Sequence, residues 1–109
     1  MERKYLKAIN FDLDTHLLGE HHPSGDYHKA YYDMKRFFKG HNFSHKQGSG
    51  YVSNVKLTIQ DIYELIIDLC ETYPWITKCV NEFDVTNVGT QYGLAEDIKS
   101  SGEELNIEL

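Results

Sequence analysis

Hydrophobic and polar residues alternate near the start of the chain and again near its end. In the segment 5–13, one side carries Tyr5, Ile9, Phe11 and Leu13, with Lys7 as an exception, and the other side carries Leu6, Ala8, Asn10 and Asp12. A period of two is typical of a β-strand that buries one face. The segment 80–88 alternates in the same way, so it predicts a second long strand.

Two segments between these strands repeat their apolar residues at helical spacing. The first begins after Asp26, a good capping residue, and is expected to run to Phe38 and end at Gly40. The second begins after Thr58, with Asp61 in the capping-box position, and is stopped by Pro74. Its predicted buried stripe consists of Ile59, Ile62, Tyr63, Ile66, Leu69 and Cys70.

The connecting segments carry turn residues. Short strands at 42–46 and 51–55 flank the sequence Gln-Gly-Ser-Gly, which predicts a hairpin. The segment 15–25 contains Gly, Pro and Ser and is expected to be a loop. One further helical turn is expected at 75–79 and a short helix at 92–99. Residues 1–99 then form one domain, and 100–109 form an acidic tail that is either disordered or an added edge strand.

The order of elements is βαββαβ. Because crossover connections are right-handed, the leading topology is the ferredoxin-like fold, an α/β (α+β) arrangement. It has a four-stranded antiparallel sheet in the order 4-1-3-2, with both helices on one face. The first and third strands are central in this order.

Length and charge narrow the classes of protein. A chain of 109 residues suits one domain, and no apolar run approaches the roughly 20 residues that span a membrane. The N-terminus runs directly into the first strand without a visible signal peptide, so we expect a cytoplasmic protein with no membrane partner. The net charge of −6 argues against a nucleic-acid partner, but residues 1–56 hold nine Lys and Arg against six Asp and Glu. A basic half is compatible with binding a polyanion on one side.

The topology brings polar residues to one edge of the sheet. These are Asp12 and Asp14 at the end of the first strand, Gln47, Ser49 and Tyr51 at the hairpin, and Glu82 and Asp84 in the last strand. Carboxylates placed together raise one another's pKa or recruit a cation such as Mg²⁺. A carboxylate in such a group can act as a base toward a 2′-hydroxyl or a water. The alternative is that an aspartate after a strand simply begins a turn.

Further candidates lie on the first helix and in the segment before it. Lys35, Arg36 and Lys39 suit phosphate contacts, although a solvated helix face is an equal alternative. Gln47, Ser49 and Tyr51 are the candidates for orienting a substrate. The histidines of the segment 15–28 lack the spacing of a zinc site, so we expect exposed loop histidines, with His16 near Asp14 as a possible proton-transfer partner.

Several segments resemble the virulence-associated protein D (VapD) family. They are Ala-Ile-Asn-Phe-Asp-Leu at 8–13, Tyr-His-Lys-Ala-Tyr-Tyr-Asp-Met at 27–34, Gln-Gly-Ser-Gly-Tyr-Val at 47–52, Pro-Trp-Ile at 74–76 and the closing segment 94–99. The resemblance implies a ferredoxin-like homodimer, related in fold to a small CRISPR-associated adaptation protein. It also implies an RNA-cleaving toxin, sometimes encoded beside an antitoxin protein. It assigns the family's strand aspartate to Asp12, and an acidic residue of the last strand to Glu82, with Asp84 as the alternative.

Two functions follow as hypotheses. In the first, the chain is an endoribonuclease that works as a homodimer, with Asp12 and Asp14 as catalytic residues and a possible Mg²⁺ on Asp12 and Glu82. In the second, the same fold is a non-catalytic adaptor that holds a protein or nucleic-acid partner. A regulatory ligand-binding domain is a third possibility, because a fold alone does not fix a function.

Overall fold

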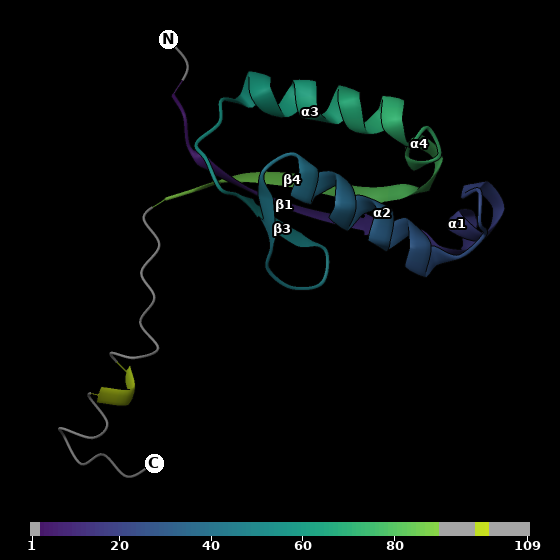
Figure 1. Cartoon of the computed structure of the whole chain (residues 1–109), viewed down its shortest axis with the longest axis horizontal. Coiled ribbons are helices and arrows are strands. Elements are labelled where there is room, and N and C mark those ends of the chain that lie inside the picture. The colour runs from purple at the N-terminus through teal and green to yellow at the C-terminus, as the bar shows by residue number, and fades with distance from the viewer. Residues whose placement is uncertain (1–2, 90–97, 101–109) are drawn as a thin grey trace.

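The computed structural model describes residues 3–89 and 98–100. Its strands and helices follow the predicted order, including the helical turn expected at 75–79, with one additional short helix at 15–21 (Figure 1). The elements are β1 (Leu6–Leu13), α1 (Thr15–His21), α2 (Tyr27–Gly40), β2 (Phe43–His45), β3 (Gly50–Ser53), α3 (Ile59–Thr72), α4 (Ile76–Cys79) and β4 (Val80–Val88).

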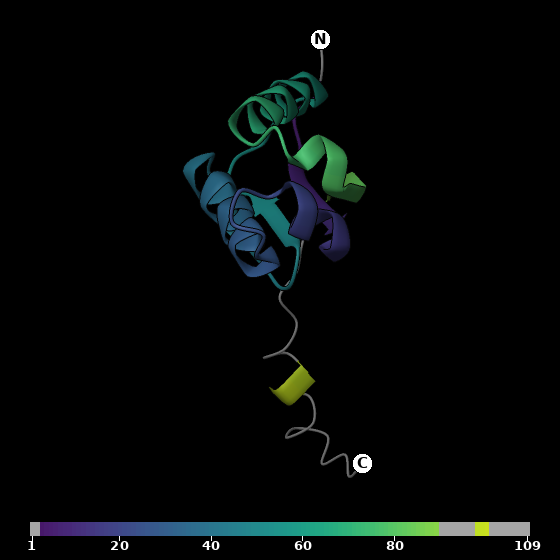
Figure 2. The same ribbon diagram turned by 90° about the vertical axis from the view of Figure 1, so that its right-hand side faces the viewer.

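The four strands form one antiparallel sheet in the order β2-β3-β1-β4. Read from the β4 edge this order is 4-1-3-2, so the predicted ferredoxin-like arrangement is confirmed. The two long helices, α2 and α3, lie on one face of the sheet, and the short helices α1 and α4 lie together where β1 ends and β4 begins (Figures 1 and 2). Strand β1 is central, and its other face is open.

The alternation in β1 separates the core from the open face. Ile9, Phe11 and Leu13 are buried under the helices, and the Phe11 ring stacks at 5.9 Å from Phe38, which is fully buried on α2. Lys7, the exception in the pattern, is also buried. Its ammonium group donates to the side-chain oxygen of Asn87, which satisfies the buried charge without a carboxylate.

Helix α1 occupies most of the segment 15–25, so the predicted loop is wrong there. Asp14 caps it, because its carboxylate accepts the backbone N–H of Leu17 at 3.0 Å. Leu18 is fully buried and anchors the helix to the core. The Pro-Ser-Gly sequence that suggested a loop begins only after the helix ends, so burial of one leucine outweighed the single Gly19 within the helix.

Helix α3 has the predicted capping box. The Thr58 N–H donates to the Asp61 carboxylate at 2.9 Å, and the Asp61 N–H donates to the Thr58 hydroxyl at 3.1 Å. The predicted stripe is partly wrong. Ile62 and Leu69 are buried as expected, but Leu65 is buried as well, while Ile59 and Tyr63 are exposed. The helix is thus rotated about its axis relative to the predicted stripe.

The capping box makes stability depend on pH. The backbone N–H of Thr58 and then its hydroxyl hold the pKa of Asp61 below its usual value. A depressed folded-state pKa contributes stability that is present above the unfolded value near 4 and is lost as pH falls through the folded value. We therefore expect Asp61→Asn to flatten the loss of unfolding free energy below pH 4, measured by urea denaturation. A wild-type pH profile equal to that of Asp61→Asn would contradict this.

The other boundaries are close to prediction. Helix α2 continues through Gly40, and the left-handed residue after it is Asn42, with φ of 66°, rather than the expected glycine. The hairpin strands are shorter than predicted, and Gly48 supplies the left-handed turn conformation between them. The predicted helix at 92–99 lies largely outside the described residues, as does the tail strand. In the described ranges, no helix has the length and apolar character needed to cross a membrane.

Candidate active site

Three carboxylates lie on the open face of the β1–β4 pair. Asp12 is directly opposite Glu82, and Asn10 is directly opposite Asp84. Opposed residues of an antiparallel pair share a face, and all four are exposed. Like charges directly opposite each other are unfavourable, so the Asp12–Glu82 pair costs stability in the isolated chain. The predicted convergence of Asp12, Glu82 and Asp84 therefore agrees with the strand register.

A bulge in β4 lies beside Asp12. Asp12 pairs with Glu82 and the next residue, Leu13, pairs with Val80, so Asn81 is the extra residue of β4. Its side-chain amide donates to a carboxylate oxygen of Asp12 at 3.2 Å. The bulge thus supplies a neutral donor that orients Asp12 at the last regular position of the ladder.

The hairpin contributes a shallow hollow to the same open face. It has a volume of about 190 Å³ and is lined by Ala8, Asn10, Lys46, Gln47, Gly50, Tyr51 and Val52. A side chain at Gly50 would come within 3.1 Å of the Asn10 amide oxygen, so this glycine allows the close approach. Gln47 therefore lies beside the strand that carries Asp12. Ser49 is half-buried in the turn and lines no described hollow.

Tyr51, predicted as a substrate contact, lies on the helix side of the sheet. It is only 3 % exposed, and its ring stacks on Phe38 at 4.6 Å. Burial raises the pKa of its phenol, which keeps the hydroxyl protonated at neutral pH. The period of two in β3 alternates its faces, and Tyr51 opposes Ile9 of the buried face. Tyr51 is a core residue whose edge lines two hollows.

Asp14 and the basic residues of α2 make contacts that do not involve the three carboxylates. The side-chain carboxylate of Asp14 caps α1, and the backbone N–H of Asp14 donates to the Cys79 carbonyl at 2.8 Å. Lys35 lines a second hollow on the helix side of the hairpin. Arg36 acts electrostatically on Tyr73, whose pKa is raised mainly by burial and by Asp33. The catalytic role predicted for Asp14 and the phosphate contact predicted for Arg36 remain predictions.

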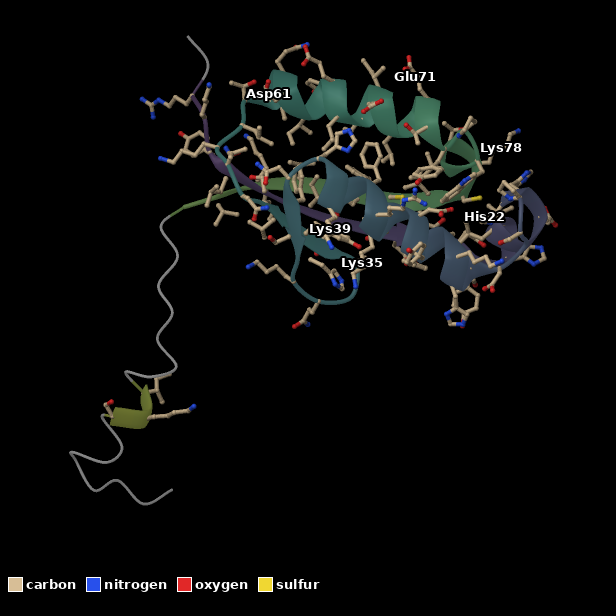
Figure 3. The ribbon with its side chains drawn as sticks, in the orientation of Figure 1. His22, Lys35, Lys39, Asp61, Glu71 and Lys78 are labelled. Carbon is tan, nitrogen blue, oxygen red and sulfur yellow. The ribbon has the colours of Figure 1, made fainter. Side chains whose placement is uncertain are left out.

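His22 is buried, contrary to the expectation of an exposed loop histidine. Its Nδ1 accepts the backbone N–H of Ser24 at 3.1 Å, so Nε2 carries the hydrogen and donates to Asp33 at 2.8 Å. The ring contacts the edge of Trp75 at 4.8 Å. His22 thus joins α1, α2 and the α4 segment (Figure 3). Its neighbours His16 and His21 are more exposed and pair with Glu20.

The open-face carboxylates are the candidate ligands for the predicted Mg²⁺. Within residues 3–89 and 98–100, no group of three His, Cys, Asp or Glu side chains is arranged to hold a metal ion. Asp12 and Glu82 alone offer two carboxylates, which is the usual protein contribution to a Mg²⁺ ion that also binds waters and phosphate oxygens. The donor set therefore fits a Mg²⁺ shared with a substrate better than a closed protein site.

Two residues of this site, Asn10 and Asn81, had no predicted role from the sequence. Asn10 was predicted only as part of an open sheet face, yet it lies between Gly50 and Asp84 in the register. Asn81 is recognisable only from the bulge, which the alternation in 80–88 does not reveal. The sole signal for Asn10 is its place two residues before Asp12 in a strand, where side chains share a face.

The sequence of this chain is similar to that of a known protein. No family model matches the chain. The chain is 31 % identical over 75 residues to "Endoribonuclease VapD 2" of Riemerella anatipestifer, a match that covers 69 % of this chain and 80 % of the relative. The match spans most of both proteins, in agreement with the segments that resemble VapD proteins. The chain therefore belongs to the VapD family.

Proposed function

We propose that this protein is an endoribonuclease whose reaction centre is the open face around Asp12. The observation that carries the proposal is the Asp12–Glu82 pair, two like charges directly opposite each other with Asp84 on the same face. Such an arrangement is unfavourable unless a cation or a substrate group relieves it. The VapD relative, which is named an endoribonuclease, supports RNA as the substrate.

The proposed chemistry assigns each residue a task. Asp12 removes a proton from a 2′-hydroxyl or a water, whose oxygen attacks phosphorus. The bond between phosphorus and the 5′-oxygen breaks, and the 5′-oxygen leaves with the electron pair and takes a proton from solvent water. Asn81 holds the carboxylate of Asp12 in one orientation. Gln47, with Asn10 and Lys46 in the same hollow, orients the RNA strand. A Mg²⁺ held by Asp12 and Glu82 would offset the charge of the phosphate.

The proposed working form is a homodimer. The open face is divided into a polar end, with the three carboxylates, and an apolar end formed by Leu6, Ala8, Val52 and Val88, which are half-buried. An apolar surface on the second face of a sheet is stabilised when another layer covers it. A second copy that covers the apolar end leaves the carboxylates next to the interface. The antitoxin partner and the cytoplasmic location stay predictions.

The test is an RNA cleavage assay on the purified protein, with its mass measured by light scattering on the same sample. We expect a dimer that cuts single-stranded RNA, and parallel reactions with Mg²⁺ or with EDTA to show whether a metal takes part. An RNA with one 2′-deoxy residue at the cleaved position separates attack by the 2′-hydroxyl from attack by water. A protein that binds RNA without cutting it under all these conditions would favour the adaptor instead.

A further inference from the structure

A second hollow lies on the helix side of the β2–β3 hairpin. It has a volume of about 280 Å³, and we call it the lysine hollow. Lys35 and Lys39 of α2 lie on the side of the helix over the hairpin (Figure 3). The lining residues are Lys35, Lys39, Phe43, Ser44, His45 and Tyr51. It is at the edge of the sheet, because β2 is the outer strand.

The charge of the lysine hollow favours an anion. Lys35 and Lys39 are one helical turn apart, and both are exposed. None of the lining residues is acidic. Within residues 3–89 and 98–100, neither Lys35 nor Lys39 forms a salt bridge with a carboxylate. Two cations without counter-charges at the rim of a hollow suit a phosphate group.

The wall of the hollow is aromatic. The His45 and Tyr51 rings lie 4.9 Å apart, and Tyr51 is held by its stacking on Phe38. His45 Nε2 donates to the Gly48 carbonyl at 2.6 Å, which fixes the ring beside the turn. The Ser44 hydroxyl already donates to Asn54 at 2.6 Å, so it is not a donor for a ligand. The lysines therefore supply the ionic contacts, and the exposed His45 supplies a flat surface for a base.

The two hollows lie on opposite sides of one hairpin. Tyr51 lines both, with Asn10, Lys46 and Gln47 around the first and the two lysines around the second. An RNA strand that extends from the carboxylates across the open face would meet the first hollow at Asn10 and Gln47. It would then pass around the outer edge of the sheet, at β2. The lysines form the next group of positive charge on that path.

We propose that the lysine hollow binds a phosphate and its adjoining base in the single-stranded RNA, outside the bond that is cleaved. This inference rests on the proposed ribonuclease function and adds a binding subsite to it. Lys35 and Lys39 contact the phosphate, and His45 contacts the base. The subsite serves affinity, while the chemistry remains at Asp12.

The test measures binding apart from cleavage. All variants are made in the Asp12→Asn background, and binding of a fluorescein-labelled single-stranded RNA is followed by anisotropy at several salt concentrations. We expect Lys35→Gln with Lys39→Gln to weaken binding about tenfold or more and to reduce the slope of log affinity against log salt by about 1.4, the value for two phosphate contacts.

A matched control removes the same charge elsewhere. Lys29 is exposed on α2 about 120° from Lys35 around the helix axis, given 100° per residue, and Lys78 is exposed on α4. Lys29→Gln with Lys78→Gln is expected to leave affinity within about twofold and the slope nearly unchanged. Equal losses in both double variants, or no loss in the Lys35 and Lys39 variant, would overturn the subsite and leave the cleavage proposal standing. A parent protein that neither cuts nor binds RNA would overturn both.

Discussion

Asp12→Asn is expected to reduce RNA cleavage by about 100-fold or more while the protein stays folded. The amide cannot accept the proton that the reaction removes, but it has the same shape as the carboxylate. Asp12 is exposed, and the described structure gives it one side-chain hydrogen bond, from Asn81 at 3.2 Å. Its replacement relieves the repulsion with Glu82. Cleavage rates and urea denaturation curves for the purified variant measure both effects.

Two control variants sharpen this result. Glu64→Gln removes one negative charge from an exposed position of α3 and is expected to leave cleavage unchanged. Asp14→Asn keeps the α1 cap, because asparagine caps a helix as well as aspartate does. A loss of cleavage in Asp14→Asn with unchanged stability would give Asp14 the chemical role predicted from the sequence. If Asp12→Asn cleaves RNA at the wild-type rate, the reaction centre does not lie on this face.

His22→Ala is expected to lower the free energy of unfolding by about 2–3 kcal/mol, because it leaves a partly buried carboxylate without its donor. The His22 side chain is 5 % exposed and that of Asp33 is 26 % exposed. The substitution also opens space beside Trp75. Loss of this ring loosens the connection between α2 and α1, which directly follows the end of β1.

The His41–Asp68 pair is a more exposed His–Asp contact in the same protein, and it serves as the comparison for His22–Asp33. Its contact of 2.7 Å is as short as that of His22 with Asp33, at 2.8 Å, but its side chains are 35 % and 52 % exposed. His41 Nδ1 also lies 2.8 Å from the Phe37 carbonyl oxygen. Because water screens an exposed pair, His41→Ala is expected to cost about 0.5–1 kcal/mol. Equal losses for the two histidines in denaturant unfolding would show that burial does not govern these pairs.

The sequence predicted the elements whose signals are local. The alternation over 80–88 predicted β4 with its observed bounds, and the residues Thr58 and Asp61 predicted the start of α3. Both signals act between neighbours in the chain. The ferredoxin-like order followed from these elements because few topologies remain once the crossovers are right-handed.

The parts that sequence reasoning missed depend on contacts between distant segments. Helix α1 forms because Leu18 reaches the core, and His22 is buried because Asp33 and Trp75 meet it from other elements. The bulge at Asn81 arises from the pairing of two strands, and the alternation within one strand does not contain it. The carboxylates could be predicted to lie together because the topology places their segments at the same edge of the sheet. The neighbours of each carboxylate could not be predicted, because they depend on the register between β1 and β4.

The alternation in β1 also protects the sheet from mispairing. A slip of one residue against β4 would turn Asn10 and Asp12 toward the helices and expose Ile9 and Phe11 to water. Burying an unpaired carboxylate is far more costly than losing a hydrophobic contact, so the slipped state is strongly disfavoured. The residues proposed for chemistry thus help to select a strand pairing that keeps Asp12 and Glu82 on the open face.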